Sequence, residues 1–448
     1  MEVIGKITVD RLKNLPKKSF LRDAFIMQIG TFFSTGMAVL ASILYARILG
    51  VHGYANYALI FAFAGIVSTF MNVGSDQTVL TLMSAAYARK DKQEITDLLS
   101  YYLVITSIFA VVIGVVALLF APLITTKLYS NANIGNMARM IIVANIVQIV
   151  WSMYVLILQI IRKIKKLTWL ENINKIFMSA VPLVFVLTGF GLSGLVFGYF
   201  MVCLIFAIYA LIRYNNLCFE NQLLPSWQEI ISNISQVASK KYTYYFKYGF
   251  LIAVDKNIGS LYSTIPFFIL GTYSLEAVAF VKIAIAYAQI PSIVLSPISR
   301  LLMVKLPQSK VISLKILRRD YLRSISGSLV ITVPLAILLY LIAPIFIPLF
   351  YGNKFMPAVG LTFPFLLAAI ITGMGIADGG VYRILNLMKQ SIIINTILIF
   401  TGTLALLQFL YSNYFTATIW LVALWLPAAT IVSIIYALIK LAPKQNAN

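Results

Sequence analysis

The sequence predicts an all-α integral membrane protein with about twelve transmembrane helices in two six-helix lobes related by a parallel repeat. Three observations predict this fold: the composition, the length of the apolar runs, and short motifs that recur half a chain apart. Of the 448 residues, 61% are hydrophobic and 11% are charged, and the mean hydropathy is +0.92. Soluble proteins carry about 25% charged residues. This chain therefore has too few polar side chains to cover a surface in water, which excludes an ordinary soluble domain.

Apolar runs of membrane-spanning length follow one another along the whole chain. A helix needs about 20 mostly apolar residues to cross a bilayer. Several runs contain proline, which membrane bundles tolerate because neighbouring helices and water satisfy the freed backbone groups. The predicted spans are residues 24–46, 54–73, 99–124, 139–161, 170–188, 192–212, 246–270, 276–299, 324–350, 358–381, 390–410 and 415–439.

The basic residues predict the orientation of these spans. Of the 35 Lys and Arg residues, 29 lie in or beside the N-tail, the even-numbered gaps and the C-tail, against four at the opposite set of gaps. Basic loops stay in the cytoplasm, so both termini are expected inside, in a multi-pass protein of the bacterial inner membrane. The net charge of +21 then suits anionic lipid headgroups.

The two halves of the sequence share short motifs in the same order. Ile48-Leu49-Gly50 recurs at residues 269–271, Leu82-Met83 at 302–303, and Ala121-Pro122 at 343–344. The offset of 220 to 222 residues spans six helices, so both halves have the same orientation, as in a parallel repeat. We predict a cytoplasmic tail (1–23), two lobes (24–213 and 246–440), a cytoplasmic linker (214–245) and a C-tail (441–448), with a substrate cleft between the lobes.

Charged residues inside predicted spans are candidates for function because their burial in lipid is costly. A cationic cleft for an anionic headgroup is predicted from Arg47, Lys256 and Lys282. Three carboxylates are candidates for binding a coupling proton or cation: Asp255, Asp76 and Asp378. Six amides also lie on or near the spans: Asn72, Gln77, Asn145, Gln148, Gln159 and Asn257.

Each of these charges also has a structural interpretation. Arg47 ends the first span, where a cation is favourable and its stem reaches the interface. Asp76 ends the second span and Asp378 faces Arg383 near the inner surface. Lys282 has Glu276 as a partner within reach. The adjacent Asp255 and Lys256 point about 100° apart on a helix, so they do not face one another, and the need of each for another partner or water favours a role in the cleft.

Several other chemistries are not supported. A single histidine and two cysteines give no metal site, and no phosphate-binding loop of the ATPase type occurs, so neither a metal nor a cofactor is expected. Residues 189–194 match G-x-G-x-x-G but join two spans, which predicts a turn. The basic and aromatic segment 240–247 precedes a span, where lysine and tyrosine anchor the interface, so nucleic acid is not expected as a partner.

The residues also resemble a known family. Residues 44–50, Leu-Tyr-Ala-Arg-Ile-Leu-Gly, followed by Tyr54 and Tyr57, resemble the "A-R-x-L-G … Y-G-x-Y" opening of Wzx-type polysaccharide flippases. These belong to the superfamily of multidrug and toxin extrusion transporters. The basic loop 89–92, Pro307 and the segment 343–352 are also similar, so short motifs extend over nearly the whole chain. Ala55 departs from the glycine that the family often has.

This resemblance implies a function by alternating access. The implied substrate is an oligosaccharide repeat unit linked to undecaprenyl diphosphate, moved from the cytoplasmic to the periplasmic leaflet for O-antigen or another surface polysaccharide. Arginine and lysine suit a diphosphate. The implied partners are this lipid-linked oligosaccharide, membrane lipids, and the polysaccharide polymerase and chain-length proteins.

Other functions remain open at this point. A proton- or sodium-coupled antiporter for drugs or cations belongs to the same superfamily and would favour acidic cleft residues. A flippase for the peptidoglycan precursor is a closer alternative, although that family usually has more helices. A membrane enzyme is not expected, because the outer gaps are short and hold no cluster of carboxylates or histidine.

Overall fold

The computed structural model describes residues 17–236, 240–385, 387–412 and 415–442. Within these ranges the long elements are all α-helices, and no strand occurs. They are α2 (Lys17–Met71), α3 (Ser75–Arg89), α4 (Lys92–Tyr129), α5 (Ala132–Ile160), α6 (Ile164–Phe185), α7 (Gly191–Glu220), α8 (Trp227–Ser232), α9 (Lys240–Tyr273), α10 (Leu275–Ala288), α11 (Ile290–Ile312), α12 (Leu314–Tyr351), α13 (Pro357–Met374), α14 (Asp378–Ile384), α15 (Met388–Tyr411) and α16 (Phe415–Lys440).

The described helices accommodate the twelve predicted spans. Nine segments in the described part of the chain are long and apolar enough to cross a membrane. One of these, Phe32–Met71, contains the first two predicted spans, and another, Ile164–Glu220, contains the fifth and sixth. The seventh predicted span falls within α9. The chain is therefore an all-helical, multi-pass membrane protein.

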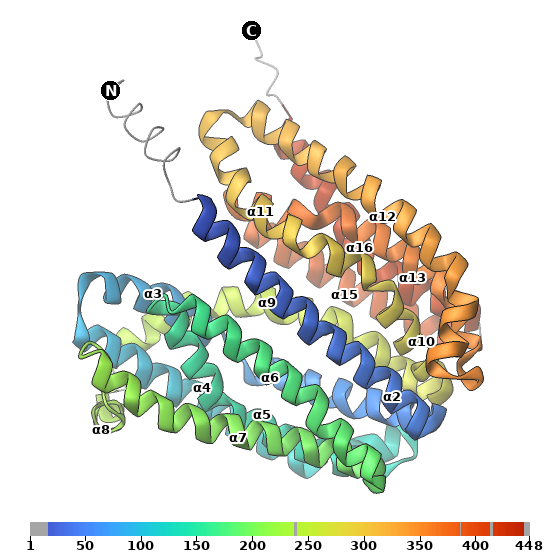
Figure 1. The fold of residues 1–448 in the computed structure, drawn as a ribbon, viewed down its shortest axis with the longest axis horizontal. Coiled ribbons are helices and arrows are strands. Elements are labelled where there is room, and N and C mark those ends of the chain that lie inside the picture. Colours follow the sequence, from blue (N-terminus) through green and yellow to red (C-terminus); the bar gives the residue numbers. More distant parts are fainter. Residues whose placement is uncertain (1–16, 237–239, 386, 413–414, 443–448) are drawn as a thin grey trace.

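The helices form two groups, one from each half of the chain. In Figure 1 the helices α3 to α7 lie in the lower group and α10 to α16 in the upper group, with the beginning of α2 running between them. Helices α4, α5, α6 and α7 pack against one another, as do α12, α13, α15 and α16 within the second half. The two groups meet mainly where α9 and α10 pack against α2.

Several element boundaries differ from the predicted ones. Helix α2 continues through the predicted gap between the first two spans, with a kink at Gly50, where φ is 66°. The predicted eighth span is divided into α10 and α11. Helix α7 continues to Glu220 rather than ending near residue 213. An apolar run marks only the part of a helix that faces lipid. The backbone hydrogen bonds of these helices continue beyond the apolar runs into polar residues, so the observed helices are longer than the predicted spans.

The glycines of residues 189–194 form a turn, as predicted. Gly189 and Gly191 have φ angles of 91° and 56° between α6 and α7, a region that glycine adopts without steric cost. Beyond this turn, a Cβ on Gly198 would lie 2.7 Å from the Cα of Pro182. This glycine therefore permits the close approach of α6 and α7 that the G-x-x-x-G spacing predicts.

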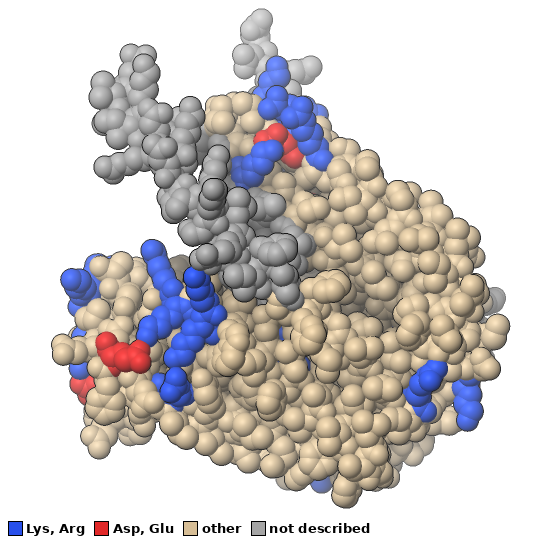
Figure 2. Space-filling view, in the orientation of Figure 1, with Lys and Arg blue, Asp and Glu red and all other residues tan. Residues whose placement is uncertain are grey.

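The charged side chains are unevenly distributed over the surface. Figure 2 shows Lys and Arg gathered at the left end of the lower group and at the top of the upper group, with a broad uncharged face between these regions and the few basic residues on the right. An uncharged band of this kind is the surface that lipid tails cover. The charges therefore mark the ends of the helices rather than their sides.

Candidate functional site

A break in the backbone between α2 and α3 positions two polar side chains. Asn72, Val73 and Gly74 lie outside the helices, and Gly74 has a φ of 82°. A Cβ at Gly74 would meet the carbonyl oxygen of Gly249 on α9, so glycine is needed for this close approach. The Asn72 side chain bridges the break: its Oδ1 accepts from the Gly74 amide, and its Nδ2 donates to Asp76, both at 3.0 Å.

Asp76 therefore does not end a helix. It lies in the first turn of α3, which continues to Arg89. A carboxylate is favourable at this position because the first turn carries the positive end of the helix dipole. The structural interpretation made from the sequence is wrong for this residue, because the helix resumes after the break at Gly74.

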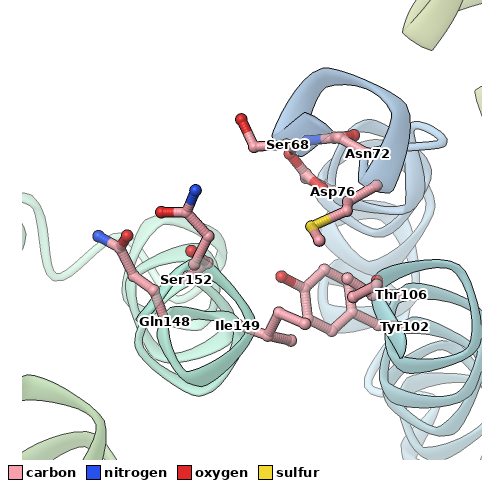
Figure 3. Close-up of a pocket in the computed structure, with 11 residues that line it drawn as sticks. Ser68, Asn72, Asp76, Tyr102, Thr106, Gln148, Ile149 and Ser152 are labelled. Carbon is pink, nitrogen blue, oxygen red and sulfur yellow. Dashed lines mark hydrogen bonds between the residues drawn. The ribbon is translucent and has the colours of Figure 1, made fainter. Parts of the chain in front are cut away.

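The side chains around this break line a polar cavity of about 250 Å³. Figure 3 shows Asn72, Asp76, Tyr102 and Thr106 on one side of the space and Gln148 and Ser152 on the other. The lining residues come from α2, α3, α4 and α5 in the first half of the chain: Ser68, Met71, Asn72, Asp76, Tyr102, Thr106, Ala110, Asn145, Gln148, Ile149 and Ser152.

A second cavity of about 340 Å³ adjoins the first and shares Asp76, Tyr102, Gln148 and Ser152 with it. Helix α6 contributes Glu171, Asn174 and Lys175 to its wall. The rest of its lining comes from α3 and α5: Gln77, Leu80, Trp151, Val155, Leu156 and Gln159. We call the two spaces together the N-half cavity.

Amides and aromatic rings dominate the chemistry of this cavity. Five of the six amides singled out in the sequence line it: Asn72, Gln77, Asn145, Gln148 and Gln159. The sixth, Asn257 on α9, donates to the backbone carbonyl of Asn72 at 2.6 Å. Each amide offers two donors and an acceptor, and rings such as those of Tyr102 and Trp151 can pack against a ligand. Such a lining suits an uncharged ligand with many hydroxyl groups.

Of the predicted cationic cleft, Arg47 and Lys282 are described, and neither is among the described residues that line these walls. Arg47 lies where the two halves of the chain meet: its Nε donates to the carbonyl of Phe350 at 2.6 Å, and its Nη2 donates to that of Leu349. Both carbonyls belong to the last turn of α12, whose free C=O groups attract a cation. Sequence analysis predicted a favourable helix end for Arg47, but not that this end belongs to the other half.

Two further contacts lie along the same junction. The Tyr129 hydroxyl of α4 donates to the Phe268 carbonyl of α9 at 2.9 Å. His52 on α2 lies 3.7 Å from Glu276 on α10, with both side chains more than half exposed. We call these contacts, with those of Arg47, the seam.

The remaining candidates lie in different places. Lys282 is half-buried on α10, with its Nζ 5.5 Å from the centroid of the Phe267 ring, a cation–π arrangement. Asp378 follows a 3₁₀ turn at the start of α14, and one of its oxygens accepts from the Tyr321 hydroxyl at 2.6 Å. The side chains of Asp255 and Lys256 lie outside the described residues. Among described residues, no cluster of His, Cys, Asp and Glu fits a metal ion.

Two buried carboxylates outside the cavity were missed by the sequence analysis. Asp97 near the start of α4 accepts from Asn233 and Lys241 at 3.0 Å, which ties the linker and α9 to the first half. Asp320 near the start of α12 accepts from Ser309 at 2.8 Å. The two lie 223 residues apart, close to the repeat offset, and this spacing is the sequence signal that could have found them.

The chain matches one protein family over most of its length. Residues 20–303 match the family described as "Polysaccharide biosynthesis protein". The chain belongs to this family. None of the curated proteins matches the chain.

Solved structures of transporters share its fold. The chain is similar to the inward-facing conformation of a multidrug resistance MATE family transporter of the MOP superfamily, with a TM-score of 0.71, 14% identity, and coverage of 92% of this chain and 96% of that one. It is also similar to the lipid II flippase MurJ in an inward closed conformation, with a TM-score of 0.73, 14% identity and coverage of 94% and 88%. For the outward-facing conformation of a MATE family transporter the TM-score is 0.64, at 15% identity and coverage of 95% and 96%. The chain thus belongs to the polysaccharide biosynthesis family and shares the fold of these transporters.

Proposed function

We propose that this protein is a flippase, which moves an oligosaccharide repeat unit, linked to undecaprenyl diphosphate, from the cytoplasmic to the periplasmic leaflet of the bacterial inner membrane. The observation that carries the proposal is the N-half cavity, whose amides, hydroxyls and aromatic rings suit sugar hydroxyl groups. A carrier lipid keeps its chain in the bilayer, so the polar headgroup alone needs a path through the protein. The asymmetry of Lys and Arg supports cytoplasmic termini.

Alternating access would bring the cavity to each side of the membrane in turn. The higher TM-score against an inward-facing transporter than against an outward-facing one supports an inward-facing state for this conformation. The seam then closes the periplasmic end. Lys282 is the proposed contact for the diphosphate, and Lys256 and Arg47 would join it when the halves rearrange. Asp378 with Tyr321, Asp76 and Asp255 are the proposed sites of a coupling ion.

A cation-coupled drug antiporter is the second candidate function. The first part of the cavity contains the carboxylate of Asp76 and no lysine or arginine among its lining residues, which would also suit a cationic drug. Loss of a flippase would change the surface polysaccharide, whereas loss of a drug antiporter would change drug sensitivity. A gene deletion therefore distinguishes the two functions.

The experiment is to delete the gene in its native host and to restore it as wild type or as the Gln148→Leu variant. Loss of the long-chain polysaccharide ladder, accumulation of lipid-linked repeat units, and rescue by the wild type would support the flippase. We expect Gln148→Leu to lower export about tenfold, because one lost amide contact removes about 1.4 kcal/mol. The matched control is Gln408→Leu, at an exposed glutamine of α15.

An unchanged ladder together with new drug sensitivity would favour the antiporter. Equal loss of export in the Gln148→Leu and Gln408→Leu variants, at equal protein levels, would mean that the cavity is not where the headgroup binds.

A further inference from the structure

Three cations gather at the ends of α6 and α7 that the basic residues predict to be cytoplasmic. Lys163 directly precedes α6, Lys166 lies in its first turn, and Arg213 lies about two turns before the end of α7. The charges of Lys163 and Arg213 both act on Lys166, and Glu220, at the end of α7, attracts all three cations. The four side chains therefore lie within electrostatic reach of one another. We call Lys163, Lys166 and Arg213 the basic cluster.

Contacts within the first half position two of these cations while leaving them accessible. The guanidinium carbon of Arg213 lies 6.0 Å from the centroid of the Tyr209 ring, a cation–π distance. The Nζ of Lys163 donates to a carboxylate oxygen of Glu220 at 2.6 Å, and both of these side chains are about half exposed. Because an exposed ion pair contributes little to stability, Lys163 can exchange this carboxylate for a ligand oxygen at small cost.

The basic cluster lies next to the N-half cavity. On α6, Lys166 and Asn174 are eight residues apart, which places them on the same side of the helix and about 12 Å apart along its axis, and Asn174 lines the cavity. On α7, the Tyr209 ring that contacts Arg213 lies 6.4 Å from the ring of Trp151, which also lines the cavity. A headgroup that fills the cavity would therefore have its other end near the cluster.

The chemistry of the basic cluster fits a diphosphate. Guanidinium and ammonium groups bind phosphate oxygens through charge-assisted hydrogen bonds. The three cations and Glu220 together carry a formal charge of +2, and a diphosphate carries more negative charge than the single charge of the phosphodiester in an ordinary membrane lipid. Lys163 and Lys166 also lie in a predicted gap between spans, at the level of the lipid headgroups, where a carrier lipid keeps its diphosphate.

We infer that the basic cluster is a loading site, which receives the diphosphate of the substrate on the cytoplasmic side while the sugars of the same headgroup enter the N-half cavity. This inference rests on the proposed function. The diphosphate would contact this cluster first and Lys282 later, because Lys282 lies on α10 in the other half of the chain. The cluster thus recognises the carrier lipid, and the cavity recognises the sugar.

Binding of farnesyl diphosphate and farnesyl monophosphate to the purified full-length protein, in nanodiscs of phosphatidylcholine, tests this site. We expect the diphosphate to bind at least about fivefold more tightly than the monophosphate, because the added charge meets further cations. Lys166→Gln and Arg213→Gln should each weaken binding of the diphosphate about fivefold, the effect of one basic residue on the binding of an anionic lipid. Arg213→Lys keeps the charge and should lose less.

The matched control is Lys315→Gln, which removes an exposed lysine from the first turn of α12 in the other half. It should leave binding of farnesyl diphosphate unchanged. Because the two glutamine variants in the cluster are independent, the test stays decisive if one of them does not fold.

A competing lipid and a sugar-linked probe separate the alternatives. Phosphatidylglycerol, added in an amount equal to that of farnesyl diphosphate, should displace well under half of it, because its phosphate carries a single charge. A disaccharide of glucose linked to farnesyl diphosphate should bind more tightly than farnesyl diphosphate alone. Gln148→Leu should remove this gain and leave binding of farnesyl diphosphate unchanged, whereas Lys166→Gln should do the reverse.

The outcomes distinguish the loading site from the proposed function. Equal binding of farnesyl diphosphate by the wild type and the two cluster variants, an equal loss in Lys315→Gln, or displacement of half the probe by phosphatidylglycerol would overturn the loading site and leave the proposed function intact. A disaccharide that adds no affinity in the wild type would overturn the proposed function itself.

Discussion

Replacing Arg47 by alanine should shift the equilibrium between the two conformations of the transporter. In the structure its guanidinium group donates to two carbonyls, those of Leu349 and Phe350. These bonds join α2 to the last turn of α12, which belong to different halves of the chain. Their loss should favour the state in which the halves separate at the seam.

The size of the shift follows from the two lost hydrogen bonds. A hydrogen bond to a charged group contributes about 1.5–3 kcal/mol, and we take about 1 kcal/mol for each because Arg47 is exposed. The total of about 2 kcal/mol corresponds to about a thirtyfold change in the ratio of the two states. Arg47→Lys should produce a smaller shift, since one ammonium group cannot span both carbonyls as the guanidinium fork does.

Pulsed electron paramagnetic resonance between spin labels at positions 48 and 354 would measure this shift. Both residues are exposed and lie near the seam on opposite halves. Cys203 and Cys218 would first be replaced by serine. The matched control is Arg139→Ala: the Nε of Arg139 donates to the Leu118 carbonyl at 2.5 Å, but both residues belong to the first half.

We expect the Arg47→Ala variant to populate longer distances than the wild type, and the Arg139→Ala variant to match the wild type. Identical distance distributions for Arg47→Ala and the wild type would refute the reasoning, as would an equal change in the Arg139→Ala control.

Three further predictions concern packing and charge. Gly198→Leu should destabilise the protein by about 1–3 kcal/mol, because a Cβ at this position would overlap Pro182. Thermal unfolding in detergent would measure the loss. Gly327→Leu is the neutral comparison, because a Cβ at Gly327 meets open space. Asp97→Asn should lower the free energy of unfolding by about 2–3 kcal/mol, because it breaks the pair between a buried carboxylate and Lys241. A thermal unfolding midpoint equal to that of the wild type would contradict this. The hydrogen bond from Lys92 lowers the pKa of Glu229 from its ordinary value of 4.5. The small contribution of this pair to the stability of the folded state is therefore complete above pH 4.5, and it is lost as the pH falls through the lower folded-state pKa. The protection of the α8 amides against hydrogen exchange, corrected for the intrinsic effect of pH on the exchange rate, should therefore fall in acid, and Glu229→Gln should abolish that fall.

The helical membrane fold could be predicted from the sequence because its signal is composition and length. Apolar runs must match the thickness of the bilayer, so every predicted span lies on described helices, although the first two share α2 and the eighth is divided between α10 and α11. Gly50 and Gly74 lie in predicted gaps between spans, but the sequence analysis did not predict that helix resumes directly after each break. Each depends on a positive φ angle at one glycine, and glycines are also common in continuous membrane helices.

Of the residues singled out in the sequence, five of the six amides line the described cavity, and of the described charges only Asp76 does. An amide within an apolar run must satisfy its polar atoms inside the protein or in a cavity, which limits where it can point. A lysine or arginine has a longer side chain that reaches polar atoms well away from its own helix turn. Arg47 illustrates this, since its partners lie about 300 residues away in the sequence, and nothing in the local pattern identifies them.

The aromatic segment at the start of α9 shows how one interpretation of a local pattern can hold for only some of its residues. Residues 240–247 were predicted to anchor the interface, yet Tyr242 and Tyr245 are buried, with 6% and 4% of their surfaces exposed. Their rings pack against Tyr101 at centroid distances of 5.8 and 5.5 Å. Tyr244, between them, is 57% exposed and fits the interfacial interpretation. The positions of these tyrosines around the helix distinguish the buried side chains from the exposed one, whereas the composition of the segment does not.

The positions of the buried carboxylates connect the repeat to the way the two halves are held together. Asp97 and Asp320 lie near the starts of α4 and α12, which occupy corresponding places in the two halves. Asp97 accepts from Lys241 at the start of α9, so it holds the first half to the helix that begins the second. Asp320 accepts from Ser309 on α11, within the second half. A buried carboxylate near the start of the corresponding helix therefore joins the two halves in the first repeat (Asp97) and stabilises a single half in the second repeat (Asp320). Because a rearrangement of the halves leaves contacts within one half in place, the Asp97 contact is expected to change during transport and the Asp320 contact to persist.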